Sequence, residues 1–379
     1  MVKPKLMFVV GTRPDAIKTA PVVVEFRKYA DVVDTVLVST GQHREMLLQA
    51  LEAFDLKSDY DLDVMTHGQT LAGVTGKILS GLDGLMESER PDMVFGQGDT
   101  TTTFVAGLAS FYRQIPYAHV EAGLRTPDIF NPFPEEFNRR AVGLFAALHF
   151  PPTQWSAENL RREGIGEEKI FVTGNTGIDA VLKVASVQGN YWFPDWSGRV
   201  VLLTTHRREN WGEPQLAIAR AARRLVEEFG DVKLVVAMHR NPAVRETLKS
   251  VLDGHERIEM IEPPDYMDFV KLIQRAHLIL TDSGGVQEEA PTFGIPVLVL
   301  RTTTERPEGV EKGTAKLIGT DEEAIFAEGS RLLGDIDKAY TLMANSASPY
   351  GDGKASERIR YIVLKHFGIE SPERKMWAY

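Results

Sequence analysis

The sequence contains no cysteine among its 379 residues. It can therefore form no disulfide, no zinc site with thiolate ligands and no thiol nucleophile. It also lacks any apolar run of about 18 residues, the length that a membrane-spanning helix requires. The N-terminal run "KLMFVV" is short and ends at a glycine turn, which is typical of a first strand and not of a signal peptide. We expect a protein of the reducing cytoplasm with no membrane partner.

Positive charge is scarce as well. Lys and Arg number 43 against 53 Asp and Glu, which gives a formal net charge of -10 at pH 7. General binding to nucleic acid or to a membrane surface usually needs a basic footprint, so we expect neither. The chain also has no G-x-G-x-x-G, Walker A, H-E-x-x-H or G-x-S-x-G motif. These absences argue against nicotinamide binding, ATP hydrolysis, zinc proteolysis and serine hydrolase chemistry.

The length suits two domains of roughly 150 to 200 residues each. Short apolar runs alternate with amphipathic stretches, as in a parallel α/β sheet, and this rhythm restarts at "RVVLLTT", residues 199–205. We therefore predict two doubly wound, Rossmann-like domains facing across a cleft, over residues 1–185 and 199–353. The Gly-, Pro- and aromatic-rich stretch 186–198 is interpreted as the linker. Residues 354–379 are expected to form a helix that packs back on the first domain.

Ligands of open α/β sheets bind beyond the carboxyl ends of the strands, so the loops there matter most. "GTRPDAIK" follows the first predicted strand. Thr12, Pro14 and Asp15 fit an ordinary helix start, with Thr12 as the cap and Pro14 in the first helical position. That interpretation does not explain Arg13 and Lys18, because cations oppose the dipole at a helix N-terminus. An anion bound between them is an equally good account.

Three carboxylates follow on successive loops of the first half, namely Asp99, Glu121 and Glu135. Asp99 alone is explained more simply as the cap of the next helix, whereas a Glu at position 121 would cap poorly. Converging carboxylates suit acid/base chemistry, because burial and mutual repulsion push their pKa values apart.

The helix that begins near Glu135 carries two i,i+4 pairs, Glu135 with Arg139 and Glu136 with Arg140. Both can be read as surface salt bridges, and for Glu136 with Arg140 that interpretation suffices.

In the second half, "THRREN" follows a strand and places His206 closest to the strand end. Three basic residues in an acidic chain indicate a local anion clamp. "AMHRNP" is similar, but Asn241 and Pro242 fit an ordinary helix start. "TTTERPEG" carries Arg306 on the loop beside "TDSGGVQEEAP", residues 281–291. This last stretch combines a glycine turn that suits phosphate with two glutamates that would repel it.

Taken together, these segments resemble the non-hydrolysing UDP-N-acetylglucosamine 2-epimerases. The resemblance rests on "GTRPDAIK", "GQHREML", "GDTTTT", "HVEAGLRT", "PFPEEFNRR", "THRREN", "TDSGGVQEEAP", "TTTERPE" and "SPYGDGKASERI". It implies the glycosyltransferase-B fold, with UDP held mainly by the second domain. It also implies interconversion of UDP-N-acetylglucosamine and UDP-N-acetylmannosamine without a cofactor or a metal, in a homodimer.

In that family UDP leaves by anti elimination to give 2-acetamidoglucal and then adds back, with a proton delivered to the opposite face. The resemblance assigns Asp99, Glu121, Glu135 and His206 to catalysis, without deciding which carboxylate serves which face. It assigns substrate binding to a further set of residues. These are Arg13, Lys18, Arg139 and Arg306 at the diphosphate, Ser283, Gly284 and Gly285 at the phosphates, and Glu289 at the ribose hydroxyls. Glu288 is left as structural.

One departure from the family concerns activation by a second substrate molecule. Many members bind this activator with a Gln-His segment, a Gln three positions on, and an Arg just before a Gln-Thr-Leu. Here Gln42 and His43 match, but Glu45 and Gly68 replace the other two. We expect simple kinetics without activation.

Several alternatives remain open from the residues. A glycosyltransferase of the same fold would bind the same kind of nucleotide sugar but would not need three carboxylates in the first domain. A 2-epimerase of UDP-2,3-diacetamido glucuronic acid, a hydrolysing epimerase and a non-catalytic sugar-nucleotide sensor are the others.

Overall fold

The structure is a computed structural model that describes residues 3–41, 44–64, 68–187 and 192–378. The chain divides into two compact units. Unit 1 comprises residues 1–182 and 350–379, and unit 2 comprises residues 183–349. The boundaries expected from the sequence ended the second domain at residue 353, whereas the structure returns the chain to unit 1 at Tyr350.

Unit 1 is built on a six-stranded parallel sheet with the order β3-β2-β1-β4-β5-β6. Its strands are β1 (Lys5–Val10), β2 (Asp34–Ser39), β3 (Tyr60–Asp61), β4 (Met93–Gln97), β5 (Tyr117–Val120) and β6 (Leu148–Phe150). The short strands β3 and β6 are not evident in the sequence, because two or three residues carry too little periodicity to be recognised.

Helices cover both faces of this sheet. They are α1 (Arg13–Arg27), α2 (Arg44–Glu52), α3 (Leu71–Glu89), α4 (Thr101–Tyr112), α5 (Glu135–Gly143), α6 (Gln154–Arg162) and α15 (Ala355–His366). Helix α7 (Thr176–Ser186) begins in unit 1 and ends in unit 2. Successive side chains of β1 point to opposite faces of the sheet. Met7 and Val9 join the apolar core on the face covered by α3 and α4. Phe8 points the other way and contacts Phe26 of α1 at a ring separation of 5.8 Å.

Unit 2 repeats the same architecture with the order β12-β11-β10-β7-β8-β9. Its strands are β7 (Arg199–Thr204), β8 (Val232–Ala237), β9 (Ile258–Ile261), β10 (Leu278–Thr281), β11 (Val297–Val299) and β12 (Ala315–Leu317). Its helices are α8 (Glu213–Glu228), α9 (Pro242–Leu252), α10 (Tyr266–Arg275), α11 (Gly284–Glu289), α12 (Pro307–Glu311), α13 (Glu322–Leu333) and α14 (Ala339–Ala344). The predicted α/β class with two doubly wound sheets is confirmed.

Each sheet reverses its strand order once, and this reversal decides where a ligand can reach the backbone. The reversal lies between β1 and β4 in unit 1 and between β7 and β10 in unit 2. Loops leaving neighbouring strands part at such a point and open a crevice at the carboxyl ends. The loops expected to carry function follow these four strands and the strands beside them.

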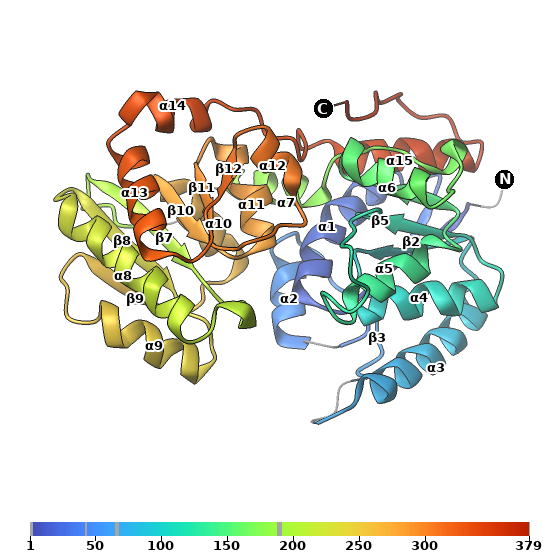
Figure 1. Cartoon of the computed structure of the whole chain (residues 1–379). Coiled ribbons are helices and arrows are strands. Elements are labelled where there is room, and N and C mark those ends of the chain that lie inside the picture. The colour runs from blue at the N-terminus through green and yellow to red at the C-terminus, as the bar shows by residue number, and fades with distance from the viewer. Residues whose placement is uncertain (1–2, 42–43, 65–67, 188–191, 379) are drawn as a thin grey trace. The chain divides into compact units, whose positions relative to one another are not determined.

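The expected linker and the expected C-terminal helix lie outside the two sheets. The stretch interpreted as a linker contributes Trp192, Phe193 and Trp196 to the apolar core of unit 2, because aromatic side chains bury large apolar areas. The expected C-terminal helix is present as α15, which lies beside α1 in unit 1 (Figure 1). Arg360 of α15 is buried and pairs with Glu25 of α1 at 3.3 Å. Within the described residues, no helix is both long and apolar enough to cross a membrane.

Candidate active site

The loop after β1 forms the start of helix α1. Thr12 is the N-cap and accepts a hydrogen bond from the backbone of Asp15, whose carboxylate accepts from the Thr12 N–H at 3.2 Å, a capping box. Arg13 is the first helical residue, so Pro14 takes the second position rather than the first. Lys18 lies one turn further along α1, and its ammonium contacts the Glu121 carboxylate.

Asp15 joins this loop to the loop after β4. It is 2% exposed, and burial raises its pKa to about 7 against the hydrogen bonds from Thr12 and Thr100. The Thr100 hydroxyl donates to Asp15 at 3.1 Å. Thr100 itself is the N-cap of α4, so Asp99 does not cap the helix that follows it. The simpler interpretation of Asp99 was wrong, because the side chain one position later already satisfies the helix end.

Asp99 is a half-buried carboxylate whose charge is opposed by an arginine. Arg139 lies 3.0 Å away, and the Asn138 amide donates to the backbone carbonyl of Asp99 at 2.9 Å. Burial raises the pKa of Asp99 to about 6. Glu121 and Glu135 raise it further, whereas Arg139 and Lys18 lower it. Glu121 and Glu135 therefore both lie close enough to influence Asp99.

Glu121 is held by side chains from three different elements. Gln97 at the end of β4 and Lys18 of α1 both donate to it, and Asn175 donates at 3.1 Å. Its backbone has φ 60°, a left-handed conformation that is uncommon for a residue with a side chain. Gln97 and Asn175 were missed in the sequence, because each lies far along the chain from the carboxylate that it contacts.

Helix α5 presents Glu135 and Arg139 beside this cluster. The predicted i,i+4 relation is replaced by other contacts, since Arg139 pairs with Asp99 and with Glu136 at 3.4 Å and donates to the Glu135 carbonyl. Glu136 pairs with Arg140 at 2.6 Å as expected, but its side chain is fully buried rather than on the surface. The Thr126 N–H donates to the same carboxylate, which explains that burial.

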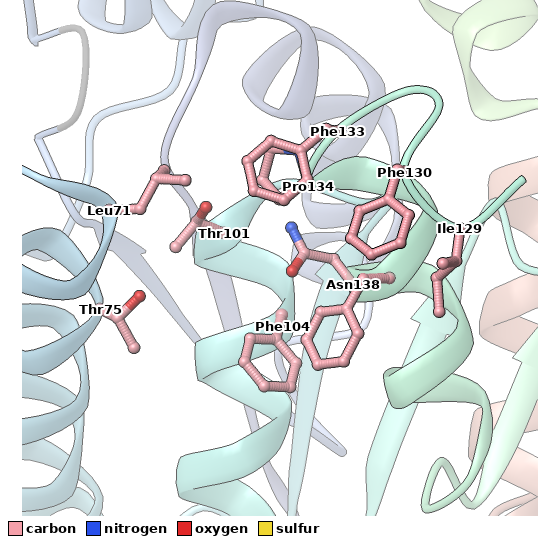
Figure 2. A pocket seen from close by; sticks show the side chains of 10 residues that line it. Leu71, Thr75, Thr101, Phe104, Ile129, Phe130, Phe133, Pro134 and Asn138 are labelled. Atoms are coloured by element: carbon pink, nitrogen blue, oxygen red, sulfur yellow. The ribbon is translucent and has the colours of Figure 1, made fainter.

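An apolar pocket of about 320 Å³ lies beside α5. Figure 2 shows the side chains that line it. Its lining comes from α3, α4, α5 and the loop before α5, and consists of Leu71, Thr75, Thr101, Phe104, Ile129, Phe130, Phe133, Pro134, Phe137 and Asn138. Phe130 and Phe133 are 73% and 62% exposed. Such exposure of large apolar side chains is typical of a binding or assembly surface.

The corresponding centre of unit 2 is Asp282, which follows β10 and is fully buried. It accepts hydrogen bonds from the loop after β7, including the backbone N–H groups of His206 and Arg207 at 3.0 Å and the Asn210 amide at 2.9 Å. Burial alone would raise the pKa of Asp282, but the hydrogen bonds and charge of His206 outweigh it and lower the pKa. Asp282 lies within the quoted glycine-turn stretch but was not singled out there.

His206 lies over Asp282 with its side chain 41% exposed and its Nδ1 atom 3.1 Å from the carboxylate. The ring of His239, at the end of β8, is stacked beside it with ring centroids 6.1 Å apart. Asn241 caps α9, so the helix-start interpretation of "AMHRNP" holds for Asn241 and leaves out His239. Burial and the neighbouring His206 lower the pKa of His239.

The Ser-Gly-Gly turn lies beneath Arg306. Ser283 is the N-cap of α11, and its N–H donates to Thr281. A Cβ added at Gly284 would meet the Arg306 guanidinium at 2.5 Å, so the glycine lets the Arg306 side chain lie directly against the turn. Gly285 has open space around its Cα, and Glu289 is the half-buried last residue of α11.

Glu288 is the buried partner of Arg306, at 2.6 Å. The sequence places two glutamates beside a turn that suits phosphate, which they would repel. The contact with Arg306 neutralises the charge of Glu288 and so removes part of that repulsion. Glu305 also pairs with Arg306, at 3.6 Å. Burial alone would raise the pKa of Glu305, but Arg301 and Arg306 lower it to about 2.

Two further features concern metal ligands and the four activator positions. Over those residues, no three His, Asp or Glu side chains gather as ligands for a metal ion. Of the four activator positions, Gln42 and His43 lie outside the described residues. Gly68 has φ 74° and open space around its Cα.

Two doubly wound units with charged loops at both switch points are typical of the glycosyltransferase-B fold. The family model for UDP-N-acetylglucosamine 2-epimerase matches residues 27–364. The UDP-N-acetylglucosamine 2-epimerase of Bacillus subtilis (strain 168) is 51% identical over 377 residues, which cover 98% of each chain. The chain therefore belongs to the UDP-N-acetylglucosamine 2-epimerase family.

Solved structures agree with this assignment. The UDP co-structure of S. aureus MnaA has a TM-score of 0.89 at 46% identity and covers 98% of this chain and 99% of that chain. The UDP-GlcNAc 2-epimerase from Neisseria meningitidis, bound to UDP-GlcNAc, has a TM-score of 0.88 at 42% identity and covers 95% of this chain and all of that chain. The family match supports the epimerase interpretation over a glycosyltransferase of the same fold.

Proposed function

We propose that the protein interconverts UDP-N-acetylglucosamine and UDP-N-acetylmannosamine by inverting carbon 2 of the sugar. Carbon 2 is not next to a carbonyl, so its proton is hardly acidic and direct inversion would be slow. Anti elimination of UDP, through 2-acetamidoglucal, supplies the driving force that direct inversion lacks. Protons must then be removed from one face and delivered to the other, which requires more than one acid/base group.

The observation that carries this proposal is the carboxylate cluster of unit 1. Asp99, Glu121 and Glu135 occupy three neighbouring loops, and their environments differ. The pKa of Asp99 is raised to about 6, which suits a group that exchanges protons near neutral pH. Glu121 is instead bound to the Lys18 ammonium and two amides, which stabilise its ionised form. We assign all three to acid/base and positioning work and leave their faces open.

Binding of the nucleotide is proposed for both units. Ser283, Gly284 and Gly285 would donate to the phosphates, and Glu289 would accept from the ribose hydroxyls. Arg306 lies against Gly284, which supports its assignment to the diphosphate. In unit 1, Arg13, Lys18 and Arg139 are assigned to stabilising the diphosphate as it leaves, where negative charge develops. His206 is assigned to the same step.

The direct test is incubation with UDP-N-acetylglucosamine in D₂O, without added metal or NAD, followed by NMR of the sugar. We expect UDP-N-acetylmannosamine to appear with deuterium at carbon 2. Free UDP together with N-acetylmannosamine would instead indicate a hydrolysing epimerase. Free UDP without epimerisation would indicate a glycosyltransferase, and either result would refute the proposal.

Two variants connect the activity to the cluster. Glu121→Gln keeps the size of the side chain but loses a base, so we expect kcat to fall by about 10² to 10⁴. Glu163→Gln is the matched control, because Glu163 forms an ordinary salt bridge with Arg125 at 2.6 Å in the same unit. Its kcat should equal that of the unchanged protein, and an equal loss in both variants would contradict the assignment.

A homodimer is part of the proposal. Its support is the group of exposed apolar side chains on unit 1, which we call the apolar surface: Leu71, Phe111, Tyr112, Phe130, Phe133, Phe137 and Leu144. Water contact with this many large apolar groups is costly, and a second copy of the chain would remove it.

A further inference from the structure

The contacts of Asp282 divide between its two carboxylate oxygens. Oδ2 accepts from the Thr205 hydroxyl, from the backbone N–H groups of His206 and Arg207, and from the Asn210 amide, at 2.9 to 3.0 Å. These contacts shape the loop after β7. Oδ1 faces the imidazole of His206, with Nδ1 at 3.1 Å, and also the His206 N–H at 3.1 Å.

An ionised carboxylate only accepts hydrogen bonds, so a proton on Nδ1 makes this 3.1 Å approach favourable, whereas a lone pair there would be repelled. In a neutral imidazole the proton then resides on Nδ1, and Nε2 keeps its lone pair. Across the part of the chain that the structure describes, Nε2 of His206 has no hydrogen-bond partner, and the side chain is 41% exposed. The nitrogen left for a ligand is therefore Nε2, in a defined protonation pattern.

We propose that Asp282 is a positioning residue that fixes the Nδ1–H tautomer and the ring orientation of His206. This inference rests on the proposed role of His206 at the leaving diphosphate. Asp282 acts through His206 and does not itself touch the substrate.

The fold places this pair with little freedom. Asp282 follows β10 directly and His206 lies just beyond the end of β7, and these strands are neighbours with Thr204 opposite Thr281. The two threonine hydroxyls share a hydrogen bond of 2.6 Å, which ties the strand ends together. The Asn210 amide binds both Asp282 and the Leu300 carbonyl, so the loop is anchored to β10 and to the end of β11. His239 supports the ring from the side, with an interplanar angle of 22°.

A purely structural carboxylate would explain the contacts of Oδ2 and the His206 N–H that Oδ1 accepts, but not the contact of Oδ1 with the imidazole. The separate contact of Oδ1 with Nδ1 predicts a result that loop stability alone does not. In Asp282→Asn, the amide oxygen remains with the four loop donors, because an NH₂ group there would face donors only. The NH₂ group then points at Nδ1 and donates to it. The neutral ring must switch to the Nε2–H tautomer, as the hydrogen-bond chemistry of the two groups requires.

The first test is ¹⁵N NMR of histidine-labelled protein, at a pH about two units above the ordinary imidazole pKa of about 6.5. The His206 signals are assigned by their loss in His206→Asn. We expect the proton of the unchanged protein on Nδ1 and the proton of Asp282→Asn on Nε2. An Nε2–H tautomer in the unchanged protein would overturn the proposal, and this measurement needs no variant of Asp282 to fold.

The second test is kinetic. We expect Asp282→Asn to lower kcat by about 10²-fold, within the range for lost general acid/base catalysis, and to change KM less than threefold. In a His206→Asn background, Asp282→Asn should cause no further loss, because its effect passes through the ring. Losses that multiply would overturn the proposal.

Asp179→Asn is the matched control. Asp179 is also a buried carboxylate that accepts from two backbone N–H groups, those of Ala355 and Ser356 at 3.0 and 2.7 Å. This variant should alter stability but leave the His206 tautomer unchanged. If His206→Asn alone retained full kcat, the proposed role of His206 would fail, whereas an unchanged tautomer in Asp282→Asn would refute the positioning inference itself.

Discussion

At the scale of single residues, the same carboxylate group is given different chemistry by its surroundings. Asp99 is desolvated and has a raised pKa, whereas Glu305 is paired with two arginines and has a lowered one. Glu136 is fully buried, yet it is satisfied by Arg140 and by the Thr126 N–H. Of Asp99 and Glu305, only Asp99 is left able to exchange a proton near neutral pH.

We expect the pH profile of kcat/KM to show an ionisation near pH 6, from Asp99. Arg139 stabilises the ionised form of Asp99, so Arg139→Gln should move this ionisation to higher pH. Arg140→Gln is the control on the same helix, because Arg140 pairs with Glu136. Initial rates across pH 5 to 9 check this prediction, and an equal shift in both variants would contradict it.

Gly68 and Glu45 lead to a second prediction at the residue scale. An anionic activator needs a cation, and Gly68 offers none at the position where many family members have Arg. The rate should therefore depend hyperbolically on UDP-N-acetylglucosamine concentration. Steady-state rates over a wide concentration range provide the measurement, and a sigmoidal curve would show that the chain retains activation.

At the scale of elements, the site is built from loops that leave parallel strands. The segment after β5 shows how closely such a loop can be packed. Glu121 has φ 60° and Gly123 has φ 87°, so the chain turns sharply and aims the Glu121 carboxylate back toward the end of β4. The Asn159 amide of α6 donates to the Gly123 carbonyl at 3.0 Å and holds the turn against the helix.

Gly123→Ala should destabilise the protein by more than the cost of placing alanine in a left-handed backbone conformation. An added Cβ would lie 2.2 Å from the Ser156 carbonyl oxygen, which is backbone and cannot move aside. Gly164 has a similar φ of 84° with open space around it, so Gly164→Ala reports only the conformational cost of about 1 to 2 kcal/mol.

The two alanine variants are compared by their midpoints of thermal unfolding. We expect Gly123→Ala to unfold at a clearly lower temperature than Gly164→Ala and to lose activity. Equal midpoints would show that the turn adapts to a side chain.

At the scale of the whole molecule, two sheets of identical strand order carry different groups of charged residues. Unit 1 carries the carboxylate cluster, and unit 2 carries the buried Asp282 beneath His206 and the Ser-Gly-Gly turn. Unit 1 takes its last helix from the far end of the chain, since α15 packs on α1 through the buried Arg360.

If a second copy covers the apolar surface, the protein in solution should have twice its mass of 42.2 kDa. Leu144 of that surface is 86% exposed, and Leu144→Asp should weaken the dimer because a charge would be buried in the interface. Leu342 is 66% exposed in unit 2, so Leu342→Asp is the matched control and should remain dimeric. Sedimentation velocity over a range of concentrations measures both, and a monomeric unchanged protein would refute the dimer.

Much of the fold could be predicted because periodicity is a local property. Each long buried strand appears as a run of apolar residues, and the restart of the pattern at Arg199 reveals the second sheet. The short edge strands β3 and β12 carry no such signal. The aromatic residues of the expected linker were misread for a related reason, since the sequence does not show that Trp192 and Trp196 pack on unit 2.

The sequence by itself determined the fold class, the family and the loops on which site residues lie, because these depend on residue types in order along the chain. Only the tertiary structure decided which side chains meet. Asn175 lies 54 residues from Glu121, and Asp282 lies 76 residues from His206. Contacts of that kind arise when parallel strands bring their carboxyl ends to one edge of a sheet. The sequence contains both His206 and Asp282 but does not show that they pair. That contact depends on the strand order, which places β7 beside β10.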